Sequence, residues 1–161
     1  MLEHISAGKV GFSQAPTVED YERFFAERLT EAQNVIHITM AKHVSQGYDN
    51  ALEAAKSFEN VTVLDSGHLS SSMGLAVLYA ASMAENHMSK TEIIKTVKKL
   101  RRYISSAFII DSTHMMCHSG RIPKRIQILC DTLLLHPIIV LKKSRMVVGS
   151  MEMGGFTHVA K

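Results

Sequence analysis

Hydroxyl side chains and a glycine follow two short apolar runs of the chain, at the positions where buried strands are expected to end. Ser45 and Gly47 follow the run 34–41, and Ser70 follows the run 61–64. A serine at a helix start lies beside unpaired backbone N–H groups, and a glycine lets a ligand approach the backbone closely. These residue types suit the capture of a carboxylate or phosphate. On the residues alone, however, we prefer the simpler interpretation that the serines cap their own helices.

The segment 113–123 contains a third group of residues whose side chains could bind a ligand. Arg121 precedes a predicted helix, and a guanidinium at such a place suits bidentate capture of an anion. His114, Cys117 and His118 have a spacing compatible with metal ligands on one helical turn. Zinc sites usually need further protein ligands, and no second cluster stands out, so we predict no metal site.

Familiar catalytic signatures are missing from the sequence. It contains no GxGxxG, no Walker loop, no GxSxG and no HExxH. His37 lies within an apolar run, where a core histidine is the preferred interpretation. Asp65 is expected either to orient a hydroxyl or to bond local backbone. We therefore predict that the protein is not an enzyme and uses no cofactor.

Strand-like and helix-like segments alternate along the chain. Apolar stripes at helical spacing, with capping boxes beginning at Thr17 and Ser89, predict helices, and short β-branched runs predict buried strands. One predicted helix, 69–87, is apolar on most faces and is expected to be central. The predicted helices begin at 17, 45, 69, 89 and 123, and the predicted strands are 34–41, 61–64, 107–110 and 138–141.

This alternation predicts an α/β fold with a mostly parallel sheet, helices on both faces and a C-terminal β-hairpin that turns at Lys143 and Ser144. Ligands of such sheets bind beyond the carboxyl ends of the strands, which is where Ser45 and Ser70 are expected. We predict a single domain over 1–161, with a tail from 149 that shows no periodic pattern.

The composition is that of an ordinary globular protein. The chain has 161 residues, of which 46% are hydrophobic and 20% charged, and its net charge of +3 is too mild to predict nucleic-acid binding. The basic run 95–102 has apolar residues at helical spacing, which favours a solvated helix face. The two cysteines show no pairing pattern, and the sequence has neither a signal peptide nor an apolar stretch of membrane length. We therefore predict a cytoplasmic protein.

Four segments, in order, resemble motifs of the DegV family. They are Ser13-Gln14-Ala15-Pro16-Thr17, Ala41-Lys42-His43-Val44-Ser45-Gln46-Gly47-Tyr48, Val63-Leu64-Asp65-Ser66 with Ser70 beyond it, and Met116-Cys117-His118-Ser119-Gly120-Arg121-Ile122. The resemblance covers about residues 13–148. Family members are roughly twice this length, so the chain is expected to be an excised part or a reduced member.

The resemblance implies a protein that encloses a long-chain fatty acid and presents its carboxylate to a fatty-acid kinase. At the matching positions, Ser13 and Ser45 would hold the carboxylate and Arg121 would lie near the pocket mouth; Gly47 and Ser70 complete the predicted ligand-binding set. A missing half would leave apolar pocket wall uncovered, so we expect the rest of a larger protein, or a second copy in a homodimer, to cover it.

Two other functions stay open at this point. A phosphotransfer domain, related in fold to sugar-phosphotransferase and dihydroxyacetone-kinase domains, would carry a modified His37 or His43. A structural domain that only dimerises would lose nothing but stability when Ser13 and Ser45 are replaced by alanine.

Overall fold

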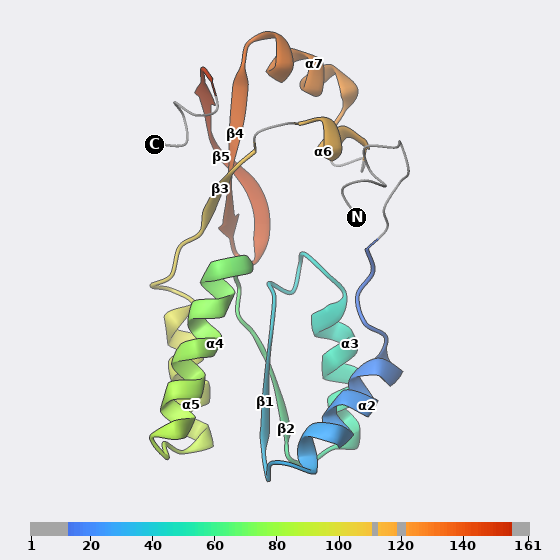
Figure 1. Ribbon diagram of the computed structural model, residues 1–161, viewed down its shortest axis with the longest axis vertical. Helices are drawn as coiled ribbons and strands as arrows, with labels where there is room; N and C mark the ends of the chain where they lie inside the picture. Colours follow the sequence, from blue (N-terminus) through green and yellow to red (C-terminus); the bar gives the residue numbers. More distant parts are fainter. Residues whose placement is uncertain (1–12, 111–112, 119–121, 156–161) are drawn as a thin grey trace.

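The computed structural model describes residues 13–110, 113–118 and 122–155, and two β-sheets with packed helices make up this part of the chain (Figure 1). The elements in chain order are α2 (Val18–Leu29), β1 (Val35–Thr39), α3 (Gly47–Ala54), the 3₁₀ turn η1 (Ala55–Ser57), β2 (Val61–Asp65), α4 (Ser70–Glu85), α5 (Lys90–Leu100), β3 (Ala107–Ile109), α6 (His114–His118), α7 (Lys124–Thr132), β4 (Leu135–Lys142) and β5 (Arg145–Met153).

The first sheet consists of β1 and β2, which pair in parallel from Val35 opposite Val61 to Thr39 opposite Asp65. Side chains of successive strand residues point to opposite faces, so both faces carry apolar residues and both need cover. Figure 1 shows how this is met: α4 and α5 lie on one side of the strands and α2 and α3 on the other. The predicted α/β architecture, with a parallel sheet between two layers of helices, is confirmed.

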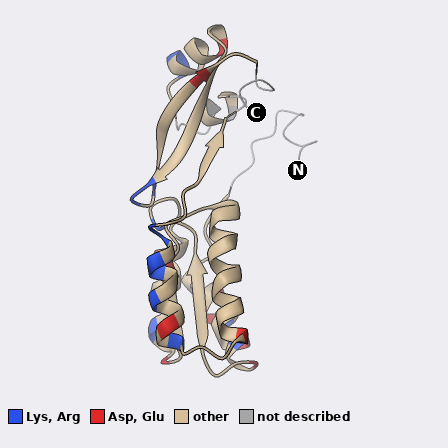
Figure 2. Ribbon diagram, turned by 90° about the vertical axis from the view of Figure 1, so that its left-hand side faces the viewer, with Lys and Arg blue, Asp and Glu red and all other residues tan. Residues whose placement is uncertain are grey.

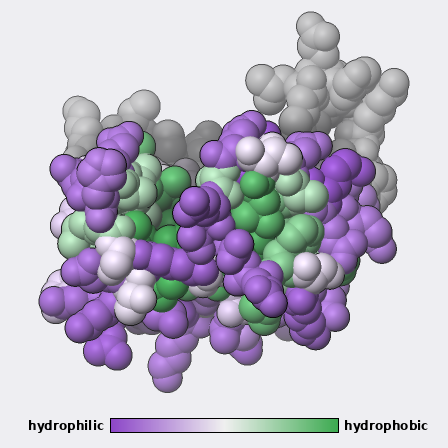
Figure 3. Space-filling model, turned by 90° about the horizontal axis from the view of Figure 1, so that it is seen from below, coloured by the Kyte–Doolittle hydropathy of each residue, from purple (hydrophilic) through white to green (hydrophobic). Residues whose placement is uncertain are grey.

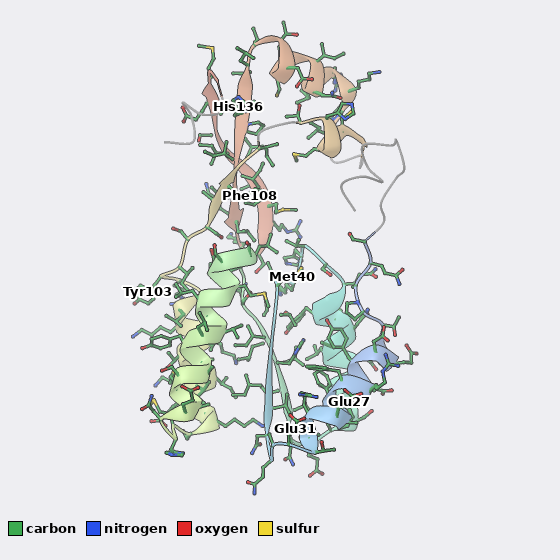
Figure 4. All side chains as sticks on the ribbon, in the orientation of Figure 1. Glu27, Glu31, Met40, Tyr103, Phe108 and His136 are labelled. Carbon is green, nitrogen blue, oxygen red and sulfur yellow. The ribbon has the colours of Figure 1, made fainter. Side chains whose placement is uncertain are left out.

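Two apolar cores fill the spaces between this sheet and its helices. The core on the side of α4 and α5 consists of Leu64, Ala80, Met83, Ile93 and Val97. The core on the side of α2 and α3 consists of Phe25, Ala51, Ala54 and Val61. Seen from below, apolar residues show in two groups with hydrophilic residues between and around them (Figure 3). The sheet therefore stabilises two half-cores, each closed by one pair of helices.

The helix starts predicted from capping boxes are confirmed. The Thr17 hydroxyl accepts the backbone N–H of Asp20 at the start of α2, and the Asp20 carboxylate accepts the N–H of Thr17. Ser89 and Glu92 exchange the same two bonds at the start of α5. Each box satisfies two N–H groups that a helix start would otherwise leave unpaired.

The second sheet has the order β3-β4-β5 and is antiparallel throughout. The C-terminal hairpin is confirmed, but two details of the prediction were wrong. The strand 107–110 does not extend the parallel sheet; β3 pairs with β4 instead. The segment after 149 is not irregular, because β5 continues to Met153, with a register shift between Ile138 and Ile139 of the partner strand.

Three boundaries also differ from the prediction. The helix expected to begin at Ser45 begins at Gly47 with Gln46 as its N-cap, and it ends in the 3₁₀ turn η1. The helix beginning after Pro123 ends at Thr132, so His136 and Pro137 do not stop it but belong to β4. Pro137, which has no N–H to donate, lies just beyond the last β3–β4 pair, Ile109 opposite Ile138, and next to the register shift in the β4–β5 pairing.

Helix α4 is less central than its composition predicted. Ala76, Ala80 and Met83 are buried, but Leu78 is 70% exposed and Leu75 is 55% exposed. The apolar residues on its outer face have no cover in the described part of the chain. An apolar helix face of this kind indicates a surface that meets another molecule or another segment.

Candidate functional site

The carboxyl ends of β1 and β2 are held together by the side chain of Asp65. Its Oδ1 accepts the backbone N–H of Lys42 at 3.1 Å and that of Gly67 at 2.8 Å. Ala41 adds a backbone bond to the carbonyl of His68 at 2.8 Å. The loops after both strands thus form one ordered platform, where ligands of parallel sheets bind.

Ser45 and Gly47 meet directly on this platform. The Ser45 hydroxyl accepts the N–H of Gly47 at 3.1 Å, so Ser45 lies one residue before the helix cap and still bonds the helix start. A Cβ added at Gly47 would lie 3.1 Å from the hydroxyl oxygen of Tyr21. Glycine is therefore fitted to close packing against α2, and Ser45 remains half-buried rather than solvated.

Ser70 is the first residue of α4 and is exposed, with a φ of +48°. This left-handed conformation is unfavourable for any residue with a side chain, and such conformations concentrate at functional sites. The N-cap residue Leu69 cannot bond the first turn through its side chain. Within the described ranges, the helix start therefore presents backbone N–H groups without a side-chain cap, at the positive end of a 16-residue helix.

Ser13 is exposed, at the beginning of the described chain. The segment that carries it is tied to α3 because the Asn50 side chain donates to the carbonyl of Pro16 at 2.7 Å. Among the described residues, no hydrogen bond joins Ser13 or Ser70 to Ser45. Arg121, the fifth residue of the predicted site, lies outside the described residues.

An apolar groove of about 670 Å³ runs between α4 and the edge strand β1. Three consecutive residues of β1 line it, together with one face of α4 and two residues further along the chain: Ile36, His37, Ile38, Met73, Val77, Ala80, Ala81, Ala84, Met88 and Ile93. Met73 lies one turn from the start of α4, so the groove opens toward the strand-end platform. Its volume lies within the usual range of ligand pockets, roughly 300–1,000 Å³.

The end of the groove away from the start of α4 also carries two polar side chains. Lys90 and Asn34 line it, and the ammonium of Lys90 donates to Oδ1 of Asn34 at 3.4 Å. The groove thus has a mainly apolar wall that reaches from Met73, one turn inside α4, to Met88, and Lys90 lies at that second end.

A second hollow of about 680 Å³ lies on the other side of β1, against α2. His37 lines it and packs edge-on against Tyr21 and Phe25, with ring centroids 5.3 Å away in both cases. Burial lowers the pKa of His37 below its ordinary value. His37 is half-buried between the two hollows and packs on aromatic side chains of α2, whereas His43 is exposed.

Two residues of this region were missed by the sequence interpretation. Ser144, in the hairpin turn, donates to Oδ2 of Asp65 at 3.2 Å, and Arg101 forms an ion pair with the same oxygen at 3.2 Å. Asp65 therefore both bonds local backbone and orients a hydroxyl, the two roles that the sequence left open. The Lys143-Ser144 turn was visible in the sequence, but nothing in it indicated the distant partner.

The three residues whose spacing is compatible with metal ligands, for which we predicted no metal site, belong to one short helix. His114, Cys117 and His118 lie in α6, and the described residues contain no group of three or more His, Cys, Asp or Glu side chains that could hold a metal ion. Cys117 and Cys130 are both free. Within the described ranges, no helix is long and apolar enough to cross a membrane.

Comparison with known proteins connects this arrangement to one family. The family model described as "Uncharacterised protein, DegV family" matches residues 1–154. A DegV domain-containing protein of Staphylococcus aureus is 24% identical over 146 residues, which cover 90% of this chain and 52% of the relative. The chain therefore belongs to the DegV family, and it spans about half the length of the curated relatives it matches.

Two solved structures are similar to it. One, described as fatty acid binding of a DegV family protein from Thermus thermophilus, has a TM-score of 0.78 and 27% identity over 95% of this chain and 55% of that chain. Another is the fatty acid kinase (Fak) B3 protein of Streptococcus pneumoniae loaded with linoleic acid. It has a TM-score of 0.74 and 16% identity, over 88% of this chain and 51% of that chain, which establishes likeness of fold.

Proposed function

We propose that this chain binds a long-chain fatty acid without transforming it, with the acyl tail in the groove between α4 and β1. The observation that carries the proposal is the groove itself, a mainly apolar channel whose lining along α4 begins at Met73, one turn inside a helix whose N-cap residue makes no side-chain bond. The likeness of the chain to a DegV protein from Thermus thermophilus described as fatty acid binding, at 27% identity, supports the choice of ligand.

The dimensions of the groove suit an acyl tail. The residues of α4 that line it run from Met73 to Ala84. At a rise of about 1.5 Å per residue this stretch is about 16 Å long. A bilayer core of about 30 Å contains two opposed layers of tails, so one tail of common length needs about 15 Å. Each methylene taken from water contributes about 0.8 kcal/mol, which makes a filled groove a strong site.

The carboxylate would lie at the start of α4, beside the strand-end platform. Free N–H groups and the positive end of the helix dipole stabilise an anion there, and the hydroxyls of Ser70 and Ser45 offer donors. Methionine and aliphatic walls accept the tail without demanding one chain shape. Ser13 and Arg121, which the family resemblance adds to the same end, belong to this proposal.

A pair of adjacent substitutions on α4 tests the site. Val77 lines the groove, whereas Leu78, the next residue, points outward and is 70% exposed. Val77→Phe fills the groove with a ring, and we expect it to weaken fatty-acid binding about tenfold or more, the loss of roughly two buried methylenes. Leu78→Phe adds the same ring outside the groove and should bind as the unsubstituted chain does. Equal affinity in both variants would contradict the site.

The exposed face of α4 supports a second part of the proposal, a covering partner. Leu75, Leu78 and Tyr79 are all more than half exposed, which is typical of a contact surface. We propose that the rest of a larger protein, a second copy of the chain or a fatty-acid kinase covers this face in the cytoplasm. Crosslinking through cysteines introduced at 75 and 78 tests this, and a chain that stays monomeric and unlinked in cell extract would contradict it.

A further inference from the structure

A third hollow, of about 390 Å³, lies where the hairpin turn meets the end of α5. Four cationic side chains line it: Lys98, Arg101 and Arg102 from the end of α5 and the turn after it, and Lys143 from the turn between β4 and β5. None of the described residues that line it is acidic. Figure 2 shows the same gathering, since the blue hairpin turn lies beside the blue end of α5.

The charges in this hollow are unevenly neutralised. The carboxylate of Asp65 neutralises Arg101 through the ion pair at 3.2 Å. Lys98, Arg102 and Lys143 form no ion pair with any residue in the described ranges. Lys98 lies in the last turn of α5 and Arg102 in the turn that follows, and both line the hollow, where like charges repel each other. An anion between them would relieve this repulsion.

His68 forms the floor of the hollow and is only 5% exposed. Neither of its ring nitrogens makes a hydrogen bond of good geometry within the described residues, although the backbone of Arg101 lies close enough to the ring to raise its pKa, against the larger lowering by burial. Buried polar groups are nearly always paired, so an unpaired imidazole beside a polar hollow marks a place for a missing partner. Arg101 lines the same hollow and packs closely on Gly67, where an added Cβ would lie 2.4 Å from its Nε.

A simpler explanation covers only part of this cluster. Cations near a helix C-terminus stabilise the helix dipole, which accounts for Lys98 and Arg102. It does not account for Lys143, which comes from a different element, nor for the unpaired His68. Convergence of two elements on one hollow is what a binding site requires.

We propose that this hollow binds a phosphate-type oxyanion. A guanidinium binds such a group through two parallel N–H bonds, and lysines add mobile point charges. The shared chemistry is a tetrahedral dianion, free or carried by a lipid headgroup. This site is separate from the proposed fatty-acid groove, so either can fail without the other.

The test is a calorimetric titration of the full chain with inorganic phosphate, at constant ionic strength. Lys98→Gln with Arg102→Gln removes two charges from the hollow; Lys124→Gln with Arg125→Gln removes two charges from α7, in the other part of the molecule. We expect saturable binding that weakens about tenfold or more in the first variant and stays unchanged in the second. Lys143→Gln, a single change in an exposed turn, should weaken binding in the same direction.

A second arm separates the sources of the anion. Vesicles of phosphatidic acid in phosphatidylcholine replace inorganic phosphate, with pure phosphatidylcholine as the blank. Binding to the acidic vesicles alone, with the same loss in the Lys98/Arg102 variant, supports the site and assigns it to a headgroup. No saturable binding in either arm, or equal weakening in both double variants, overturns the proposal. Thermal melts without ligand confirm that each variant is folded before it is titrated.

Discussion

Ser144 donates a hydrogen bond from its hydroxyl to Oδ2 of Asp65 over 3.2 Å, although 79 residues separate the two. Arg101 completes the contact, because its guanidinium donates to the Ser144 hydroxyl and pairs with the same Asp65 oxygen. The hairpin turn, the end of β2 and the turn after α5 therefore meet at one carboxylate, whose side chain is 6% exposed. This contact fixes the antiparallel hairpin to the parallel sheet.

We expect the strength of this contact to show in substitutions at the turn. Ser144 and Lys143 have φ values of +62° and +52°, as a two-residue type I′ turn requires. Ser144→Ala removes the hydrogen bonds and keeps the unfavourable φ, so it should lower the free energy of unfolding by about 1–2 kcal/mol. Ser144→Gly also loses the bonds but relieves the backbone by roughly 1 kcal/mol, so it should cost less.

Lys143→Gly is the matched control for these variants. It relieves the same kind of backbone strain and breaks none of the hydrogen bonds to Asp65, so urea denaturation should give an unchanged or higher stability. If Ser144→Gly and Lys143→Gly proved equally stable, the contact with Asp65 would contribute nothing.

Two glycines of the same region should respond to alanine in opposite directions. Gly67 has a φ of +72°, and an added Cβ would lie 2.8 Å from Cγ of Arg101, so Gly67→Ala should destabilise the fold by about 1–3 kcal/mol. Gly74 lies within α4, and nothing stands within 4 Å of an added Cβ. Gly74→Ala should therefore stabilise the helix by about 0.5–1 kcal/mol. Thermal and urea unfolding of the two variants check the signs, and a loss of stability in both would be the contrary result.

Ser70 offers a test of stability against function. Its φ of +48° is strained for serine, so Ser70→Gly should raise the free energy of unfolding by up to about 1 kcal/mol. The same change removes a hydroxyl from the proposed carboxylate end and should weaken fatty-acid binding severalfold, by roughly the worth of one hydrogen bond. A variant that gains stability and keeps full affinity would remove Ser70 from the site.

Stability should fall as the pH is lowered from 7 to 5. Burial is the main cause that lowers the pKa of both His37 and His68 below the ordinary 6.5. The unfolded chain therefore takes up protons near pH 6.5 while the folded chain does not, so the histidines favour folding above that pH and this contribution is lost below it. The capping carboxylates Asp20 and Glu92 have pKa values lowered from 3.8 and 4.5, so their contribution is lost at more acidic pH.

His37→Phe isolates one of the two histidines. Phenylalanine preserves the edge-on packing against Tyr21 and Phe25 and cannot take up a proton. Urea unfolding at several pH values should show a shallower slope between pH 7 and 5 than in the unsubstituted chain. An identical slope would mean that His37 does not contribute to the pH dependence.

Local signals in the sequence were sufficient to predict much of this fold. The capping boxes at Thr17 and Ser89 depend on residues three positions apart, and the strands of the parallel sheet are short runs rich in β-branched residues, most of them half-buried. The turn at Lys143 and Ser144 was likewise found from neighbouring residues. Each of these features is decided within a few residues of the chain, and each was confirmed.

The features that were missed depend on distant partners. The pairing of β3 with β4 rather than with the parallel sheet is not encoded in three apolar residues, since such a run suits either sheet. The bond from Ser144 to Asp65 crosses 79 positions. The exposed face of α4 was mistaken for core because an apolar face looks the same whether its cover comes from this chain or from another molecule.

The features of the site likewise differ in whether they depend on neighbouring or on distant residues. The meeting of Ser45 with Gly47 follows from two neighbouring residues, although Gln46 rather than Ser45 caps the helix. The strain at Ser70 and the uncapped start of α4 needed the backbone geometry. The groove needed both strands and helices in place, since its wall combines β1 with a helix more than thirty positions further along the chain.

The most direct test of the account is to purify the chain, denature it, extract it with organic solvent and analyse the extract by mass spectrometry. We expect a long-chain fatty acid at close to one equivalent per chain, retained in Leu78→Phe and reduced in Val77→Phe. Protein of normal stability that is reproducibly empty, and that takes up no added fatty acid, would contradict the central claim that this half-length DegV chain is a fatty-acid-binding protein.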